Sequence, residues 1–198
     1  VITKYGLKII KKLNLLQNIR EEGPSIHFSK KNTPTMGGIF IISPFLLLLL
    51  VVSNYSDSNG IMLLFFCSIS FFIIGIVDDY LSIRGKENTG LKSNEKLTLQ
   101  ALFAIIFIIL AFQNNYISDL IVISTNWTID ANIIIFPICF ITIVGLSNAV
   151  NLTDGLDGLA TGCSSIVFYG LGTEIFIKGQ KELIIYGLIA YAMSGLCM

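Results

Sequence analysis

The side chains of this chain that are best suited to chemistry gather in short polar segments that follow apolar runs. Asp78 and Asp79 follow one such run, and the segment Asn148–Gly158 follows another. Carboxylates at the mouth of a membrane span are costly to place, so they indicate function rather than anchoring. In the second segment polar side chains recur at every third position: Asn148, Asn151, Asp154 and Asp157. This spacing keeps them on one side of a helix or 3₁₀-like turn, while Gly155 and Gly158 predict that part of the segment is a loop.

The neighbouring carboxylates predict a bound cation. Adjacent carboxylates repel, so one of Asp78 and Asp79 should be protonated unless a cation lies between them and a ligand. Mg²⁺ typically binds one or two carboxylates together with phosphate oxygens. The basic residues that follow the pair, Arg84, Lys86 and Lys96, suit a phosphate group. Taken alone, the Asp78-Asp79 pair could instead be a solvated acidic helix end. Any two of the Asn and Asp residues in 148–158 could likewise belong to an ordinary capping turn.

A third polar segment, His27–Gly38, joins lysines and hydroxyl groups to a Gly-Gly pair at the start of an expected helix. Free backbone N–H groups at a helix N-terminus, with Lys30 and Thr35 nearby, can bind an anion. Taken alone, the segment is more simply explained as basic residues beside a membrane followed by a proline turn. Lysines, a carboxylate pair and a polar turn on one membrane face are together the parts of a phosphoryl-transfer site, which works by positioning and charge neutralisation.

Composition places these segments in a membrane protein. Of 198 residues, 54% are hydrophobic and 13% are charged, whereas a soluble domain carries about 25% charged residues. Balanced charge, with 13 basic and 13 acidic residues, does not indicate a nucleic-acid partner. Six runs are long and apolar enough to be spans, with approximate bounds 36–53, 60–77, 97–113, 132–150, 158–177 and 183–198. The predicted fold class is therefore all-α, a polytopic helix bundle that forms a single integral-membrane domain over residues 1–198.

Lysine and arginine predict the orientation of the bundle. Residues 1–35, a basic and amphipathic segment, hold seven of them and residues 78–96 hold four, whereas the loops at 54–59 and 114–131 hold none. Both basic segments are therefore predicted to be cytoplasmic, and alternation of the spans places 148–158 on the same side. We accordingly expect 78–96 and 148–158 to be cytoplasmic active-site loops. The chain starts at Val1 and stops at Met198 inside an apolar run, so we expect a piece of a longer protein, truncated at both ends.

At these residues the chain resembles bacterial phospho-N-acetylmuramoyl-pentapeptide transferase, within the polyprenyl-phosphate sugar-1-phosphate transferase superfamily. The resemblance rests on four motifs: His27–Gly38, Asp78–Tyr80, Gly90-Leu91 with Glu95–Leu97, and Asn148–Ala160. It implies an enzyme of the bacterial plasma membrane with ten spans, of which about six are present. Such an enzyme transfers phospho-MurNAc-pentapeptide from UDP-MurNAc-pentapeptide to undecaprenyl phosphate, gives lipid I and UMP, and requires Mg²⁺. The resemblance also implies contact with the lipid bilayer, and it is compatible with a homodimer.

The resemblance also implies roles for individual residues. The catalytic residues are Asp78, Asp79 and Asp154, of which Asp78 activates the lipid phosphate. Asp79 is the implied Mg²⁺ ligand, with a further ligand expected beyond Met198. The implied substrate-binding residues are Lys30, Thr35, Lys96, Asn148, Asn151 and Asp157. Ser82 departs from the family, which usually has a lysine there, so one basic contact is either absent or supplied by Arg84. Direct attack by the lipid phosphate and passage through an aspartyl intermediate both remain open.

Two other functions remain as alternatives. One is a sugar-1-phosphate transferase that takes UDP-N-acetylhexosamine as donor. The other is a non-catalytic membrane scaffold or transporter piece, although transporters bind substrate near the membrane midplane and the acidic groups here lie at span ends. Because a third metal-binding aspartate of the family would lie beyond Met198, the 198 residues alone are predicted to be inactive.

Overall fold

Six α-helices make up most of the structure, a computed structural model that describes residues 36–55, 58–84, 90–118, 120–124, 127–153 and 158–198. The helices are α2 (Gly38–Val52), α3 (Ser58–Arg84), α4 (Ser93–Gln113), α5 (Ile135–Thr153), α6 (Leu159–Lys178) and α7 (Ile184–Cys197). Two 3₁₀ turns, η2 (Asn132–Ile134) and η3 (Lys181–Leu183), precede α5 and α7. Each of the six predicted spans is matched by one of these helices, because apolar runs in lipid must satisfy every backbone N–H and C=O group internally.

Four of these helices are long and apolar enough to cross a bilayer: α3, α4, α6, and α5 taken together with η2. Their most apolar stretches are largely unburied, with only 6% of the stretch in η2–α5 buried inside the structure. Helices that expose apolar surface on this scale require lipid or further protein around them. The predicted fold class, an all-α membrane helix bundle, is therefore confirmed.

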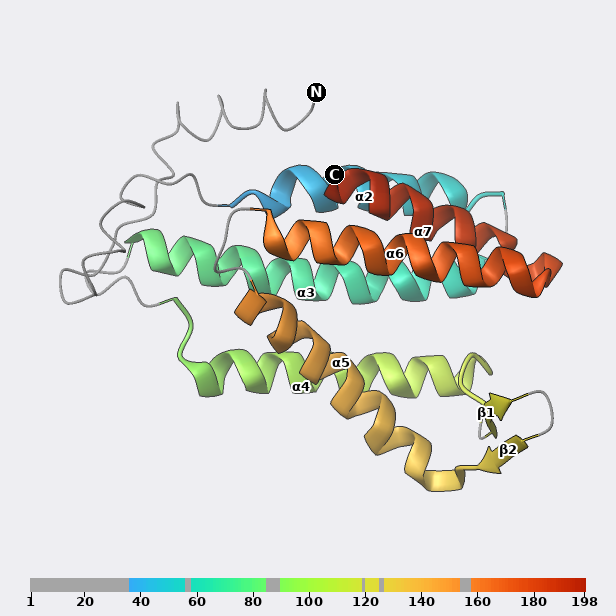
Figure 1. Cartoon of the computed structure of the whole chain (residues 1–198). Coiled ribbons are helices and arrows are strands. Elements are labelled where there is room, and N and C mark those ends of the chain that lie inside the picture. The colour runs from blue at the N-terminus through green and yellow to red at the C-terminus, as the bar shows by residue number, and fades with distance from the viewer. Residues whose placement is uncertain (1–35, 56–57, 85–89, 119, 125–126, 154–157) are drawn as a thin grey trace.

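A small hairpin was not foreseen from the sequence. Strand β1 (Leu120–Ser124) pairs with β2 (Trp127–Asp130) in an antiparallel two-stranded sheet, with Leu120 opposite Asp130 and Ile121 opposite Ile129. The segment is rich in β-branched residues, which favour extended backbone. It lies at the opposite end of the bundle from the polar segments (Figure 1).

Small residues set the contacts of α6 and α7. Ser165 and Ser194 are both buried, and each hydroxyl donates to the other residue's backbone carbonyl, at 3.0 and 2.9 Å. Close helix approach through small side chains and hydrogen bonds is the usual way that helices associate in lipid. The apolar core that joins this pair to α2 and α3 consists of Phe45, Leu49, Ile61, Ile189, Met193 and Cys197.

The polar segments meet at one end of the bundle. Figure 1 shows the N-terminal ends of α2, α4 and α6 beside the C-terminal ends of α3 and α5. The expected boundaries need correction, because neither 78–96 nor 148–158 is wholly a loop. Helix α3 continues through Asp78 and Asp79 to Arg84, and α5 continues through Asn151 to Thr153. Loss of apolar character marks where a helix leaves the membrane, whereas its backbone hydrogen bonds can continue into the polar region. The predicted helix break is found before α6, where Gly158 has a φ of +80°.

Candidate active site

Lys96 joins two of the predicted site residues. Its ammonium group forms a 2.9 Å ion pair with Asp78 Oδ2 and donates a 3.1 Å hydrogen bond to Asn151 Oδ1. The three side chains come from α4, α3 and α5, so this one cation connects three helices. The pair is partly shielded from solvent, since the side chains of Lys96 and Asp78 are 16% and 25% exposed. Charge-assisted hydrogen bonds of this kind are roughly twice as strong as those between neutral groups.

The second oxygen of Asp78 holds the segment that leads into α4. Leu91 donates its backbone N–H to Asp78 Oδ1 at 2.9 Å. Gly90 packs so tightly here that an added Cβ would lie 2.8 Å from the Asp78 backbone oxygen and still closer to its carboxylate. Only glycine lets the backbone approach this closely. The start of α4 is then fixed by Glu95, whose carboxylate accepts the Lys92 N–H at 3.1 Å.

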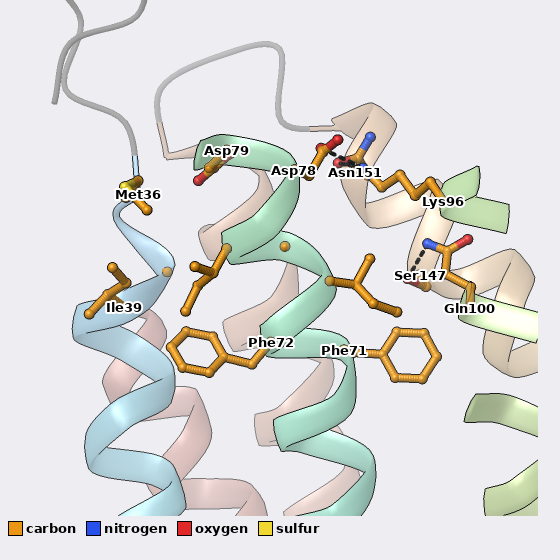
Figure 2. Close-up of a pocket in the computed structure, with 14 residues that line it drawn as sticks. Met36, Ile39, Phe71, Phe72, Asp78, Asp79, Lys96, Gln100, Ser147 and Asn151 are labelled. Carbon is orange, nitrogen blue, oxygen red and sulfur yellow. Dashed lines mark hydrogen bonds and ion pairs between the residues drawn. The ribbon is translucent and has the colours of Figure 1, made fainter. Parts of the chain in front are cut away.

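The two neighbouring aspartates face different partners. Successive residues of a helix are rotated by about 100°, and Figure 2 shows Asp78 directed towards Lys96 and Asn151 while Asp79 lies on the side of Met36. The cation beside Asp78 is therefore Lys96. Arg84, considered as a substitute for the missing basic contact, has its guanidinium carbon 4.9 Å from the centre of the Tyr80 ring.

A cavity of about 200 Å³ lies beside these groups. Its polar lining includes both aspartates and Lys96, with Gln100, Ser147 and Asn151. The remaining lining is largely apolar and comes from α3 and the start of α2: Met36, Gly38, Ile39, Phe71, Phe72, Ile74, Gly75 and Ile76 (Figure 2). A space that is polar at one part and apolar at another can receive the head group of an amphipathic molecule and the beginning of its chain.

A second polar layer lies one helical turn deeper between α4 and α5. Gln100 is 2% exposed; its Nε2 donates to Ser147 Oγ at 3.1 Å, and its Oε1 accepts from Asn148 Nδ2 at 2.8 Å. Asn148 Nδ2 also donates to the Val144 carbonyl at 2.8 Å. Motif reasoning missed Gln100 and Ser147. The available signal was a lone amide within the apolar run of α4, since such groups in lipid require a partner on another helix.

The structure brings Asp78, Asp79, Lys96 and Asn151 together around one cavity. Asn148 lies on the same face of α5 as Asn151, as the three-residue spacing predicted, but its amide contacts Gln100 and it is not among the cavity-lining residues. Lys30, Thr35, Asp154 and Asp157 lie outside the described residues, so their assignments stay predictions.

A Mg²⁺ ion at this site would need ligands besides the protein side chains. Among the residues that the structure describes, no group of three or more His, Cys, Asp or Glu side chains could hold a metal ion. Mg²⁺, however, is commonly held by one or two carboxylates together with substrate phosphates and water. Asp79 borders the cavity, and its carboxylate is a ligand of the type that such an arrangement uses. The residues present therefore fit a metal that is completed by substrate oxygens.

Comparisons with known proteins point to one family. The model of the family "Glycosyl transferase family 4" matches residues 61–198, and the model of "Phospho-N-acetylmuramoyl-pentapeptide-transferase signature 1" matches residues 30–42. A phospho-N-acetylmuramoyl-pentapeptide-transferase of Prochlorococcus marinus subsp. pastoris is 78% identical over all of this chain and 55% of its own length. One of Prochlorococcus marinus strain MIT 9515 is 75% identical over all of the chain and 54% of its own length. One from a Synechococcus species is 36% identical over 91% of the chain and 49% of its own length. The chain thus spans about half the length of these relatives.

Proposed function

The chain belongs to glycosyl transferase family 4, and from that premise we propose that it carries part of the active site of a phospho-N-acetylmuramoyl-pentapeptide transferase. The reaction moves phospho-MurNAc-pentapeptide from UDP-MurNAc-pentapeptide to undecaprenyl phosphate. An oxygen of the lipid phosphate forms a bond to the phosphorus that carries the sugar. The bond between that phosphorus and the bridging diphosphate oxygen breaks, and UMP leaves. The products are UMP and lipid I.

The observation that carries the proposal is the contact of Lys96 with both Asp78 and Asn151 beside a cavity that is part polar and part apolar. An ammonium group has three N–H donors, and these contacts use two of them. The third can donate to a diphosphate oxygen without loss of either partner. Lys96 would thereby lie between Asp78 and the substrate phosphate, lower the repulsion between them and help to position the substrate, and positioning and electrostatic stabilisation are the main requirements of phosphoryl transfer.

The remaining roles follow the predicted ones. Asp78 would meet the lipid phosphate, and Asp79 would hold Mg²⁺, which supplies charge neutralisation at the diphosphate when bound. Asn151 would help to orient the nucleotide donor. Asp154, Asp157, Lys30 and Thr35 are proposed to complete the catalytic and donor-binding groups. Asn148 contacts Gln100 outside the cavity lining, so its predicted role in substrate binding is not part of this proposal. The distribution of lysine and arginine, which predicts that residues 1–35 and 78–96 are cytoplasmic, supports a cytoplasmic site in the bacterial plasma membrane, where a soluble nucleotide donor is available.

The test uses a full-length chimera, in which these 198 residues replace the matching 55% of the Prochlorococcus marinus subsp. pastoris relative. We expect the purified chimera to release UMP from UDP-MurNAc-pentapeptide only when undecaprenyl phosphate and Mg²⁺ are both present. An inactive chimera beside an active parental relative would overturn the proposal. Faster consumption of UDP-N-acetylhexosamine than of the pentapeptide donor would instead support the hexosamine alternative.

The isolated chain provides a second arm of the same assay. Because it spans about half of its relatives, we expect no UMP release above background from the 198 residues alone. UMP release by the isolated chain would contradict the expected inactivity of the 198 residues, but it would support the proposed transferase reaction.

A further inference from the structure

Gln100 lies where it can control the position of Lys96. It follows Lys96 by four residues on α4, so both side chains project from the same face of the helix. Asn151 follows Ser147 by four residues and Asn148 by three on α5, so these also share a face. The facing surfaces of α4 and α5 therefore carry two layers of polar contacts: Lys96 with Asn151 near the helix ends, and Gln100 with Ser147 and Asn148 one turn deeper.

The deeper layer is the more completely buried of the two. Gln100 is 2% exposed and uses both ends of its amide, whereas Lys96 lies nearer to solvent at the cavity. An interhelical amide with both ends paired fixes the rotation and the axial register of two helices, since sliding either helix would leave a polar atom unpaired away from water. Farther along the pair, Phe112 and Phe136 pack edge to face with ring centres 5.1 Å apart. Apolar contact is non-directional, so the paired amide specifies the register more sharply than the ring contact does.

We propose that Gln100 is a positioning residue of the phosphoryl-transfer site, which holds α4 against α5 in the register that lets Lys96 reach Asp78 and Asn151 at once. The side-chain hydrogen bonds of Gln100 join it to Ser147 and Asn148, so its effect on Lys96 passes through the two helices. The proposal rests on the proposed function, because its main readout is transferase activity. A displacement of about 1 Å at reacting groups can lower a rate by about 100-fold, so even a small loss of register should be measurable.

The test is a substitution of Gln100→Met in the full-length chimera, which keeps the length of the side chain and removes both hydrogen bonds. We expect kcat for UMP release to fall about tenfold or more, with KM for the nucleotide donor changed less than about threefold. The matched control is Ser165→Ala, which removes an equally buried interhelical hydrogen bond between α6 and α7. It should lower the melting temperature and leave kcat within about twofold.

A double-mutant cycle separates positioning from direct contact. If Gln100 acts through the contact between Lys96 and Asn151, then Gln100→Met should cost much less in an Asn151→Ala background than in the unsubstituted chimera. Should Gln100→Met fail to fold, Ser147→Ala removes one of the two hydrogen bonds and gives a milder form of the same cycle. Additive effects in both cycles, or an unchanged kcat in a folded Gln100→Met variant, would overturn the proposal. An inactive unsubstituted chimera would instead count against the proposed function.

Discussion

Replacement of Gly90 by alanine offers the sharpest test of the site geometry. An alanine Cβ at this position would lie 2.8 Å from the backbone oxygen of Asp78 and 3.0 Å from its carboxyl carbon. The backbone oxygen belongs to α3 and cannot rotate away, so the segment that holds Gly90 and Leu91 must move outward. That movement stretches the 2.9 Å hydrogen bond from Leu91 to Asp78 and shifts the carboxylate that Lys96 binds.

The size of the effect follows from the lost hydrogen bond. A hydrogen bond to a charged group contributes about 1.5–3 kcal/mol, and each 1.4 kcal/mol corresponds to about a tenfold change in rate. If most of that energy holds Asp78 in its active position, kcat of Gly90→Ala should fall by about 10- to 100-fold. The assay is UMP release by the full-length chimera with saturating donor and lipid phosphate.

Gly145→Ala is the matched control for this substitution. An added Cβ at Gly145 meets nothing within 4 Å, and alanine within a helix is favoured over glycine by about 1 kcal/mol. This variant should fold at least as well as the unsubstituted chimera and keep its rate. If Gly90→Ala also keeps its rate within about twofold, the reasoning that Asp78 depends on this close backbone approach is refuted.

Substitutions at three further positions test separate parts of the structure. Asp79→Asn should lower Mg²⁺-dependent UMP release by about 100-fold or more with little change in melting temperature. Activity near that of the unsubstituted chimera would show that Asp79 is not the metal ligand. Lys96→Ala should lower kcat by at least about 100-fold, and Lys96→Arg should restore part of it because the charge is kept; equal activity of the two variants would count against a charge role. Gly172→Ala places a Cβ 2.9 Å from the Tyr191 ring and 3.1 Å from the Gly187 carbonyl, so overpacking should destabilise the α6–α7 contact by about 1–3 kcal/mol. Its melting temperature in detergent should fall with kcat retained, and an unchanged melting temperature would show that the contact relaxes freely.

Much of the fold could be predicted because membrane spans depend on local composition. The six apolar runs became six helices, since lipid leaves the backbone of such a run few alternatives to a helix. The ends of these helices were predicted less well. Asp78 and Asp79 were expected in a loop yet lie within α3, because polarity marks the membrane boundary and not the end of the hydrogen-bonded helix. The hairpin of β1 and β2 lies in the connection 114–131, where polar and β-branched residues are mixed, and this length and composition allow several conformations.

The residue types at the ends of the spans, and the common helix face of Asn148 and Asn151, follow from the order of residues in the chain. The partners of these side chains follow from the packing of the helices: Lys96 pairs with Asp78 and not with Asp79, and Asn148 donates to Gln100. The physical reason is that spacing along a helix fixes the relative directions of its own side chains. The rotation and register of that helix against its neighbours depend on packing between residues far apart in the chain, such as Gln100 with Ser147.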